Sequence, residues 1–338
     1  MILLGNIKGF HKGNRGRTAK GISVTKFALL FKREKGRAFL KNEELIIVAN
    51  GVSHWVKIAG AEHNTIPLII VHGGPGGNQQ LIQKTLGPEL EKFSTVIFYE
   101  QRGCGRSSRP CDAWDYSMET IVSDLDSIVD HLQLDTFNLL GTSFGGEIAM
   151  EYTVAHQEKV HKLLLQGPVD GNWERLRCIQ FFGYQFVAKG EAKGKIQQIL
   201  SEDGTYEERS ARVRDVIDLS TIARLSIYKE ELIPEAMKEM EKFEGNGDYH
   251  LAITSRKQNK QPLLDRITTI KTPTLIIVGL HDRNTGIEMS RDIHAKIDGS
   301  KLVILEKSAH YPEVDEPERY MEEIKQFIET REDLTQGE

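Results

Sequence analysis

Short, continuous apolar runs recur along the chain and predict strands that are covered on both faces. Between these runs, apolar residues follow the i, i+3, i+4, i+7 spacing of amphipathic helices, most clearly over 118–132, where Ser117 precedes the first turn as an N-cap. Near the N-terminal side, the runs 44–49 and 54–58 flank Asn50-Gly51 and predict a β-hairpin. Alternating strands and helices predict an α/β fold with a mostly parallel sheet. The predicted buried strands are 67–71, 95–99, 137–140, 160–165, 273–278 and 301–305.

Residues 167–262 interrupt this alternation. The segment is polar and rich in helical patterns, and it has no run typical of a buried strand. We therefore expect a helical insertion, called the cap below, between the two parts of one core, residues 43–166 and 263–333. Residues 1–42 are expected to form a basic extension and residues 334–338 a short tail. The helices expected in the cap are 196–200, 213–219, 222–227 and 234–243.

One stretch carries the pattern of a catalytic turn. The predicted strand 137–140 ends at Gly141, Ser143 follows, and Gly145-Gly146 leads into a helical pattern. This is G-x-S-x-G between a strand and a helix, the nucleophile elbow, in which the serine adopts strained dihedral angles and its neighbours must be small. Taken alone, this motif is equally compatible with a Gly/Ser turn that has no catalytic role. The catalytic interpretation therefore depends on whether the chain also supplies an acid and a histidine for a triad.

An acid and a histidine follow the last two predicted strands. Asp282 comes after the strand ending at Val278, and His310 comes after the strand ending at Leu305. The order Ser, Asp, His is that of the α/β-hydrolase triad, in which the acid orients the imidazole and the imidazole accepts the serine proton. Asp170 is the alternative acid.

The segment His72-Gly-Gly-Pro-Gly-Gly77 also follows a predicted strand. Glycines allow backbone amides to approach a reacting carbonyl, so we expect the amides of Gly74 and Phe144 to form an oxyanion hole, with Gly73 beside the substrate. A phosphate loop is excluded because no Gly-Lys-Ser/Thr follows. No His/Cys/Asp cluster has metal-ligand spacing, so we expect neither a metal nor another cofactor.

Three motifs together resemble the proline iminopeptidase-like branch of the α/β-hydrolase superfamily. They are His72–Gly77, residues 100–107 (Glu-Gln-Arg-Gly-Cys-Gly-Arg-Ser) and Gly141–Gly146, with Glu100 where that branch usually has Asp. The resemblance extends over about residues 43–332. It implies a mostly parallel eight-stranded sheet flanked by helices, with a helical cap after the sixth strand.

The resemblance also implies an activity, because enzymes of this branch remove N-terminal residues and bind the free amine through cap carboxylates. In the segment Glu244-Gly-Asn-Gly-Asp248-Tyr249 the amine-binding acid would be Asp248, and Glu174 is a second candidate. We therefore expect a serine hydrolase acting on small peptides or amides. The alternatives are an esterase or lactonase for small apolar esters, and a ligand receptor on a hydrolase fold with a slow triad.

The composition of the chain is consistent with this interpretation. Of 338 residues, 39% are hydrophobic and 28% charged, and no apolar run is long enough to span a membrane. Three cysteines without ligand spacing favour a reducing compartment, and we expect a cytoplasmic protein, monomeric or weakly homo-oligomeric. Residues 1–42 hold eleven Lys or Arg and one acid, although the whole chain has a net charge of −5. We expect a surface extension rather than a nucleic-acid module, with an organellar transit peptide as the alternative.

Overall fold

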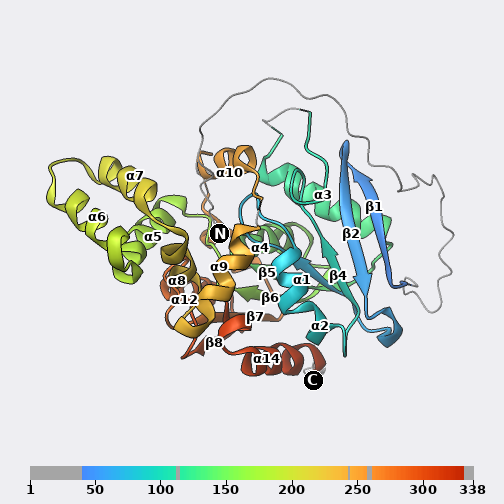
Figure 1. Cartoon of the computed structure of the whole chain (residues 1–338). Coiled ribbons are helices and arrows are strands. Elements are labelled where there is room, and N and C mark those ends of the chain that lie inside the picture. Colours follow the sequence, from blue (N-terminus) through green and yellow to red (C-terminus); the bar gives the residue numbers. More distant parts are fainter. Residues whose placement is uncertain (1–39, 112–114, 243, 257–260, 331–338) are drawn as a thin grey trace.

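The computed structural model describes residues 40–111, 115–242, 244–256 and 261–330. The tail 334–338 and nearly all of the basic extension lie outside these residues. The described chain contains one eight-stranded sheet with the order β1-β2-β4-β3-β5-β6-β7-β8 (Figure 1). Its strands are β1 (Glu43–Ala49), β2 (Val52–Ala59), β3 (Leu68–Val71), β4 (Val96–Tyr99), β5 (Phe137–Thr142), β6 (Val160–Gln166), β7 (Thr274–Gly279) and β8 (Lys301–Leu305).

The sheet is mostly parallel, as the sequence predicts. Strand β2 is antiparallel to β1 and to β4, and all other neighbouring strands are parallel. The predicted hairpin is confirmed: Asn50 and Gly51 have φ angles of 46° and 76°, which a two-residue turn between twisted strands requires. Because strands β3 to β8 all run in one direction, the loops after them meet at one edge of the sheet.

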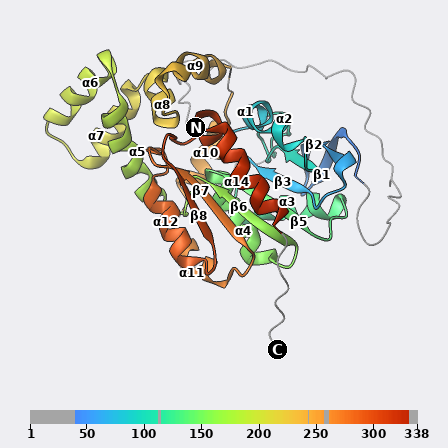
Figure 2. The same cartoon turned by 90° about the horizontal axis from the view of Figure 1, so that it is seen from below.

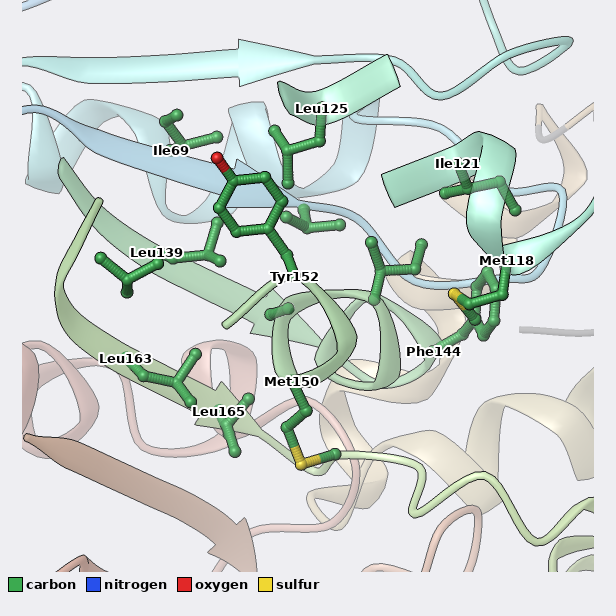
Figure 3. Packing of buried hydrophobic residues seen from close by; sticks show 14 of the residues in the cluster. Ile69, Met118, Ile121, Leu125, Leu139, Phe144, Met150, Tyr152, Leu163 and Leu165 are labelled. Carbon is green, nitrogen blue, oxygen red and sulfur yellow. The ribbon is translucent and has the colours of Figure 1, made fainter. Parts of the chain in front are cut away.

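Helices cover both faces of the sheet (Figure 2). On one face, α3, α4 and α12 pack over side chains such as Ile69, Leu139 and Leu163. On the other face, α1, α2 and α14 pack over side chains such as Ile70 and Leu164. Figure 3 shows the first of these layers around α4. These helices are α1 (Gln80–Thr85), α2 (Gly87–Leu90), α3 (Met118–His131), α4 (Phe144–His156), α12 (Ile287–Lys296) and α14 (Pro317–Glu329).

Alternate residues of the central strands enter opposite layers, and this explains their continuous apolar runs. Along β3, Leu68 and Ile70 belong to one cluster and Ile69 and Val71 to the other, and all four side chains are fully buried. A strand covered on both faces has no polar face to show in its sequence. Burial on both sides also fixes the strand ends, and therefore the loops that follow them.

The described part of the cap contains six α-helices. Figure 1 shows α5, α6 and α7 farthest from the sheet, with α9 and α10 nearer to it. The expected helix 213–219 is wrong at its end, because α7 stops at Val216 and the side chain of Asp218 caps the next helix by accepting the amide of Thr221. The cap helices are α5 (Trp173–Val187), α6 (Gly190–Ser201), α7 (Tyr206–Val216), α8 (Leu219–Ser226), α9 (Ile233–Glu241) and α10 (Gly247–Thr254).

The remaining α-helices of the described chain are short, α11 (Leu263–Arg266) and α13 (Pro312–Asp315). The sequence analysis did not predict α13, which begins at Pro312, two residues after His310. Cys104, Cys111 and Cys178 are all free thiols. Within the described ranges, no helix has the length and apolar character that crossing a membrane requires.

Candidate active site

Ser143 lies at the turn between β5 and α4. Its φ and ψ angles are 56° and −122°, a conformation that non-glycine residues rarely adopt. The turn is tight: a Cβ added at Gly141 would overlap the carbonyl oxygen of Gly145, and one added at Gly145 would overlap that of Val71. The glycines of the motif are therefore required by close backbone packing, and the serine is held at the first turn of a helix.

His310 and Asp282 are brought together from the loops after β8 and β7. The His310 Nδ1 atom lies 2.9 Å from Asp282 Oδ2, and both side chains are buried. An ionised carboxylate only accepts hydrogen bonds, so Nδ1 donates and Nε2 is left free of a proton to act as an acceptor. Asp282 also accepts the amides of Asn284 at 2.8 Å and Thr285 at 3.0 Å.

These contacts decide the charge of Asp282. Burial acts to raise its pKa, but the charge and hydrogen bond of His310, with the two donated amides, outweigh burial and hold the pKa below its usual value. Asp170, the alternative acid, makes other contacts: it accepts the amide of Asn172 at 2.8 Å and pairs with Arg175 at 3.2 Å. Asp282 is therefore the acid that contacts His310.

Ser143 and His310 line the same cavity, which has a volume of about 450 Å³. The loop after β3 forms the wall beside the serine. A Cβ on Gly73 would lie 3.0 Å from Ser143 Cβ, and Gly74 lines the cavity as well. Phe144 is the first residue of α4, so its amide has no acceptor within the helix and lies at the positive end of the helix dipole. In this arrangement the backbone amides of Gly74 and Phe144 can donate hydrogen bonds to a negative charge that develops beside Ser143.

His72 orients the peptide group between Gly73 and Gly74. Its buried ring accepts the amide of Gln101 at Nε2, 3.2 Å away, so the proton lies on Nδ1 and is donated to the carbonyl oxygen of Gly73 at 2.8 Å. In a trans peptide the carbonyl and the following N–H point in opposite directions. His72 therefore fixes the direction of the Gly74 amide. Burial lowers the pKa of His72, which keeps the ring neutral in this role.

The cap forms the opposite wall of the cavity. Four apolar side chains reach it from α9 and from the segment between α8 and α9, and the acids Glu235 and Glu239 lie on the same wall. Lys84 of α1 pairs with Glu239 across the cavity at 2.6 Å. The wall is thus mainly apolar, with paired charges at α9. The apolar residues are Ile227, Leu232, Ala236 and Met240.

Asp248 and Glu174, the acids expected to bind an amine, do not line this cavity. The Asp248 side chain is 67% exposed and lies 3.8 Å from Arg109, and Glu174 is exposed in the first turn of α5. Two residues of the Asp248 segment are buried, Asn246 and Tyr249, and Asn246 donates to the carbonyl of Gly103 at 2.9 Å. Because Asn246 turns inward, Asp248, two residues later at the start of α10, turns outward.

Three residues of the site were missed by the sequence analysis. Gln166 donates from Nε2 to the carboxylate of Glu313 at 2.8 Å and to the carbonyl of His310 at 3.2 Å. Asp315 accepts the amide of Ala309 at 2.9 Å. All three are buried polar residues at or after strand ends. No local pattern in the sequence marks these three polar residues as buried.

No group of three or more potential metal-ligating side chains occurs in the described part of the chain.

Comparisons with known proteins support the α/β-hydrolase fold. A family model of the α/β hydrolase fold matches residues 66–201. The chain is 27% identical over 294 residues to a proline iminopeptidase of Saccharolobus solfataricus, covering 82% of this chain and 90% of that protein.

Solved structures give the same fold. A proline iminopeptidase-related protein of Thermus thermophilus superposes with a TM-score of 0.69 at 22% identity, covering 86% of this chain and 98% of that one. An esterase of Exiguobacterium antarcticum superposes with a TM-score of 0.61 at 25% identity, covering 84% and 99%.

Proposed function

Because this chain is a hydrolase with the α/β-hydrolase fold, similar to the proline iminopeptidases, we propose that it cleaves its substrates through an acyl-enzyme formed on Ser143. The observation that carries this proposal is the shared cavity of Ser143 and His310, with His310 held by Asp282 at 2.9 Å. Strained dihedral angles at Ser143 support it further, since such strain is typical of functional positions.

In the proposed mechanism, Ser143 Oγ attacks the substrate carbonyl and gives its proton to His310 Nε2. The imidazolium that forms is stabilised by the ionised carboxylate of Asp282. Negative charge on the carbonyl oxygen is taken up by the amides of Gly74 and Phe144. His310 then gives the proton to the leaving group, and a water molecule, deprotonated by His310, hydrolyses the acyl-enzyme and regenerates Ser143 Oγ–H.

The substrate class that we propose is small peptides or amides with a free N-terminal residue, as for a proline iminopeptidase. The similarity to such an enzyme over most of both chains supports this class. The cavity also has the character that the class needs, because apolar walls suit a small side chain and carboxylates are present near the nucleophile. The amine must then be bound by an acid other than Asp248 or Glu174.

An esterase or lactonase for small apolar esters is the second candidate. It is favoured by one observation, the exposure of both acids that the sequence suggested for amine binding. An ester substrate would use the same triad and oxyanion hole and would need no partner for a cation.

Two measurements test the proposal. A fluorophosphonate probe should label the protein on Ser143, and Ser143→Ala should abolish labelling. A panel of aminoacyl p-nitroanilides and p-nitrophenyl esters then separates the two substrate classes. Preference for free aminoacyl amides supports the peptidase, and turnover of esters alone supports the esterase. Absence of both labelling and turnover would refute acyl-enzyme chemistry at this site.

A further inference from the structure

Among the described residues, three carboxyl groups line the cavity beside Ser143, and two of them are matched by cations. Glu239 pairs with Lys84 at 2.6 Å and with Lys242 at 3.0 Å. The Glu235 side chain is 65% exposed and lies 3.3 Å from Lys238. Solvent and lysines therefore compensate both of these charges on the cap wall.

Glu313 is the third acid, and its surroundings differ. It lies on α13, three residues after His310, and only 5% of it is exposed. Within the ranges that the structure describes, no Lys, Arg or His nitrogen lies within 4.0 Å of its carboxylate. Its side-chain partner is the neutral amide of Gln166. A buried carboxylate without a cation is costly, because a neutral hydrogen bond replaces only part of its hydration.

Burial raises the pKa of Glu313 to about 8, and the charge of Asp315 adds to this effect. The other titratable groups that interact with Glu313 are Tyr311 on its own loop and Tyr320 on α14, and neither supplies a positive charge. The cavity thus presents a carboxyl group that holds its proton at neutral pH for lack of a positively charged partner.

Gln166 links Glu313 to the reacting centre. Its carbonyl oxygen accepts the amide of Ser143 at 2.8 Å, and its side chain donates to both Glu313 and the carbonyl of His310. The α-amine of an aminoacyl substrate is separated from the attacked carbonyl carbon by one carbon atom. A group that recognises this amine must therefore lie close to the nucleophile, and Glu313 is the buried acid anchored there.

We propose that Glu313 is the specificity-determining residue that binds the cationic α-amine of the substrate. This inference rests on the proposed peptidase function. Below pH 8, binding of an ammonium group displaces the proton of Glu313 into solvent and leaves a carboxylate–ammonium pair. The cavity thereby favours free aminoacyl groups over N-blocked or uncharged acyl groups.

Kinetics of Glu313→Gln test the inference, with Glu235→Gln as the matched control at an exposed acid of the same cavity. The readout is the ratio of kcat/KM for prolyl p-nitroanilide to that for p-nitrophenyl butyrate. The ratio should fall at least tenfold in Glu313→Gln and less than threefold in Glu235→Gln. An unchanged ratio in Glu313→Gln, with both substrates turned over by the unmodified enzyme, would overturn the role of Glu313 and leave the proposed function standing.

Binding gives a second test that needs no turnover. Isothermal titration with L-prolinamide, in two buffers of different ionisation enthalpy, should show proton release on binding at pH 7. Glu313→Gln should bind L-prolinamide at least tenfold more weakly and release no proton. N-acetylprolinamide should not distinguish the two proteins. If L-prolinamide does not bind, or binds both proteins equally, Glu313 does not recognise an amine, whatever the activity of the enzyme.

Discussion

The carboxylate of Asp315 accepts a hydrogen bond from the backbone amide of Tyr228, and this contact joins the cap to the loop that carries His310. The distance is 3.0 Å, and the same carboxylate accepts the amides of Lys229 and Ala309. A further bond in the same place runs from the Tyr311 amide to the carbonyl of Ser226 at 3.0 Å. Asp315, which is fully buried, therefore contributes to the position of the cap and to that of the loop that carries His310.

Asp315→Asn should impair catalysis although Asp315 does not line the cavity. Asparagine offers one acceptor oxygen instead of two and turns an NH₂ group toward backbone donors, which leaves amides unsatisfied at a cost of about 1–3 kcal/mol in stability. We expect kcat to fall about tenfold or more, because small misplacements of catalytic groups are costly. Kinetics and thermal unfolding check this, with the exposed Glu318→Gln as control. An unchanged kcat in a stable Asp315→Asn protein would contradict the coupling.

Ser143→Ala should lower kcat by at least ~10⁴, because triad members act as a unit. Asp282→Asn should cause comparable damage, because an amide permits the wrong tautomer of His310. The control is Asp170→Asn, which removes a buried acid from the Arg175 pair instead. If Asp170→Asn were inactive and Asp282→Asn retained most of its activity, the assignment of the acid would be wrong.

His72→Ala should lower kcat by about 10- to 1,000-fold with a small change in KM, because the Gly74 amide loses its orientation and an oxyanion donor is worth about 10²–10³. His72→Asn should restore part of the loss, since the Asn side-chain amide can donate to the Gly73 carbonyl where Nδ1 did. The measurement is kcat against KM for both variants. Equal loss in both, or a loss confined to KM, would argue against this positioning role.

Stability should depend on pH through Glu313. Its pKa is about 8 in the folded protein and is ordinarily 4.5, so between these values the folded state binds more protons than the unfolded state. The free energy of unfolding therefore falls as the pH rises from about 4.5 to about 8, and the loss is complete above the folded pKa. Urea unfolding at pH 5, 6.5 and 8 should show a shallower decline for Glu313→Gln than for the unmodified protein. A decline of the same steepness in both proteins would show that other groups cause it.

Strand ends explain why much of the site could be predicted. Ser143, Asp282 and His310 each follow an apolar run, and runs buried on both faces are recognisable without knowledge of the tertiary structure. The order of the strands in the sheet was not needed, because parallel strands bring all their C-terminal ends to one edge.

The acid that we propose for amine binding could not be predicted in this way. Whether Asn246 or Asp248 faces inward depends on long-range hydrogen bonds from Asn246 to Gly103 and Tyr116, which no local pattern in the cap reveals. The same holds for Glu313: its carboxylate is buried against Gln166 of β6, an element distant in the sequence. In polar segments without a periodic pattern of apolar residues, the sequence therefore gives little information about which side chains face inward.

The division of the cavity wall has a consequence for how such an enzyme can acquire new substrates. Ser143, His310 and Glu313 come from the core, whereas Leu232, Ala236 and Met240 come from the cap. Substitutions along α9 can therefore reshape the space for the substrate side chain while the acyl-transfer groups stay in register with the sheet. Natural variation and directed evolution should both find altered specificity more readily in α9 than in the loops after the strands.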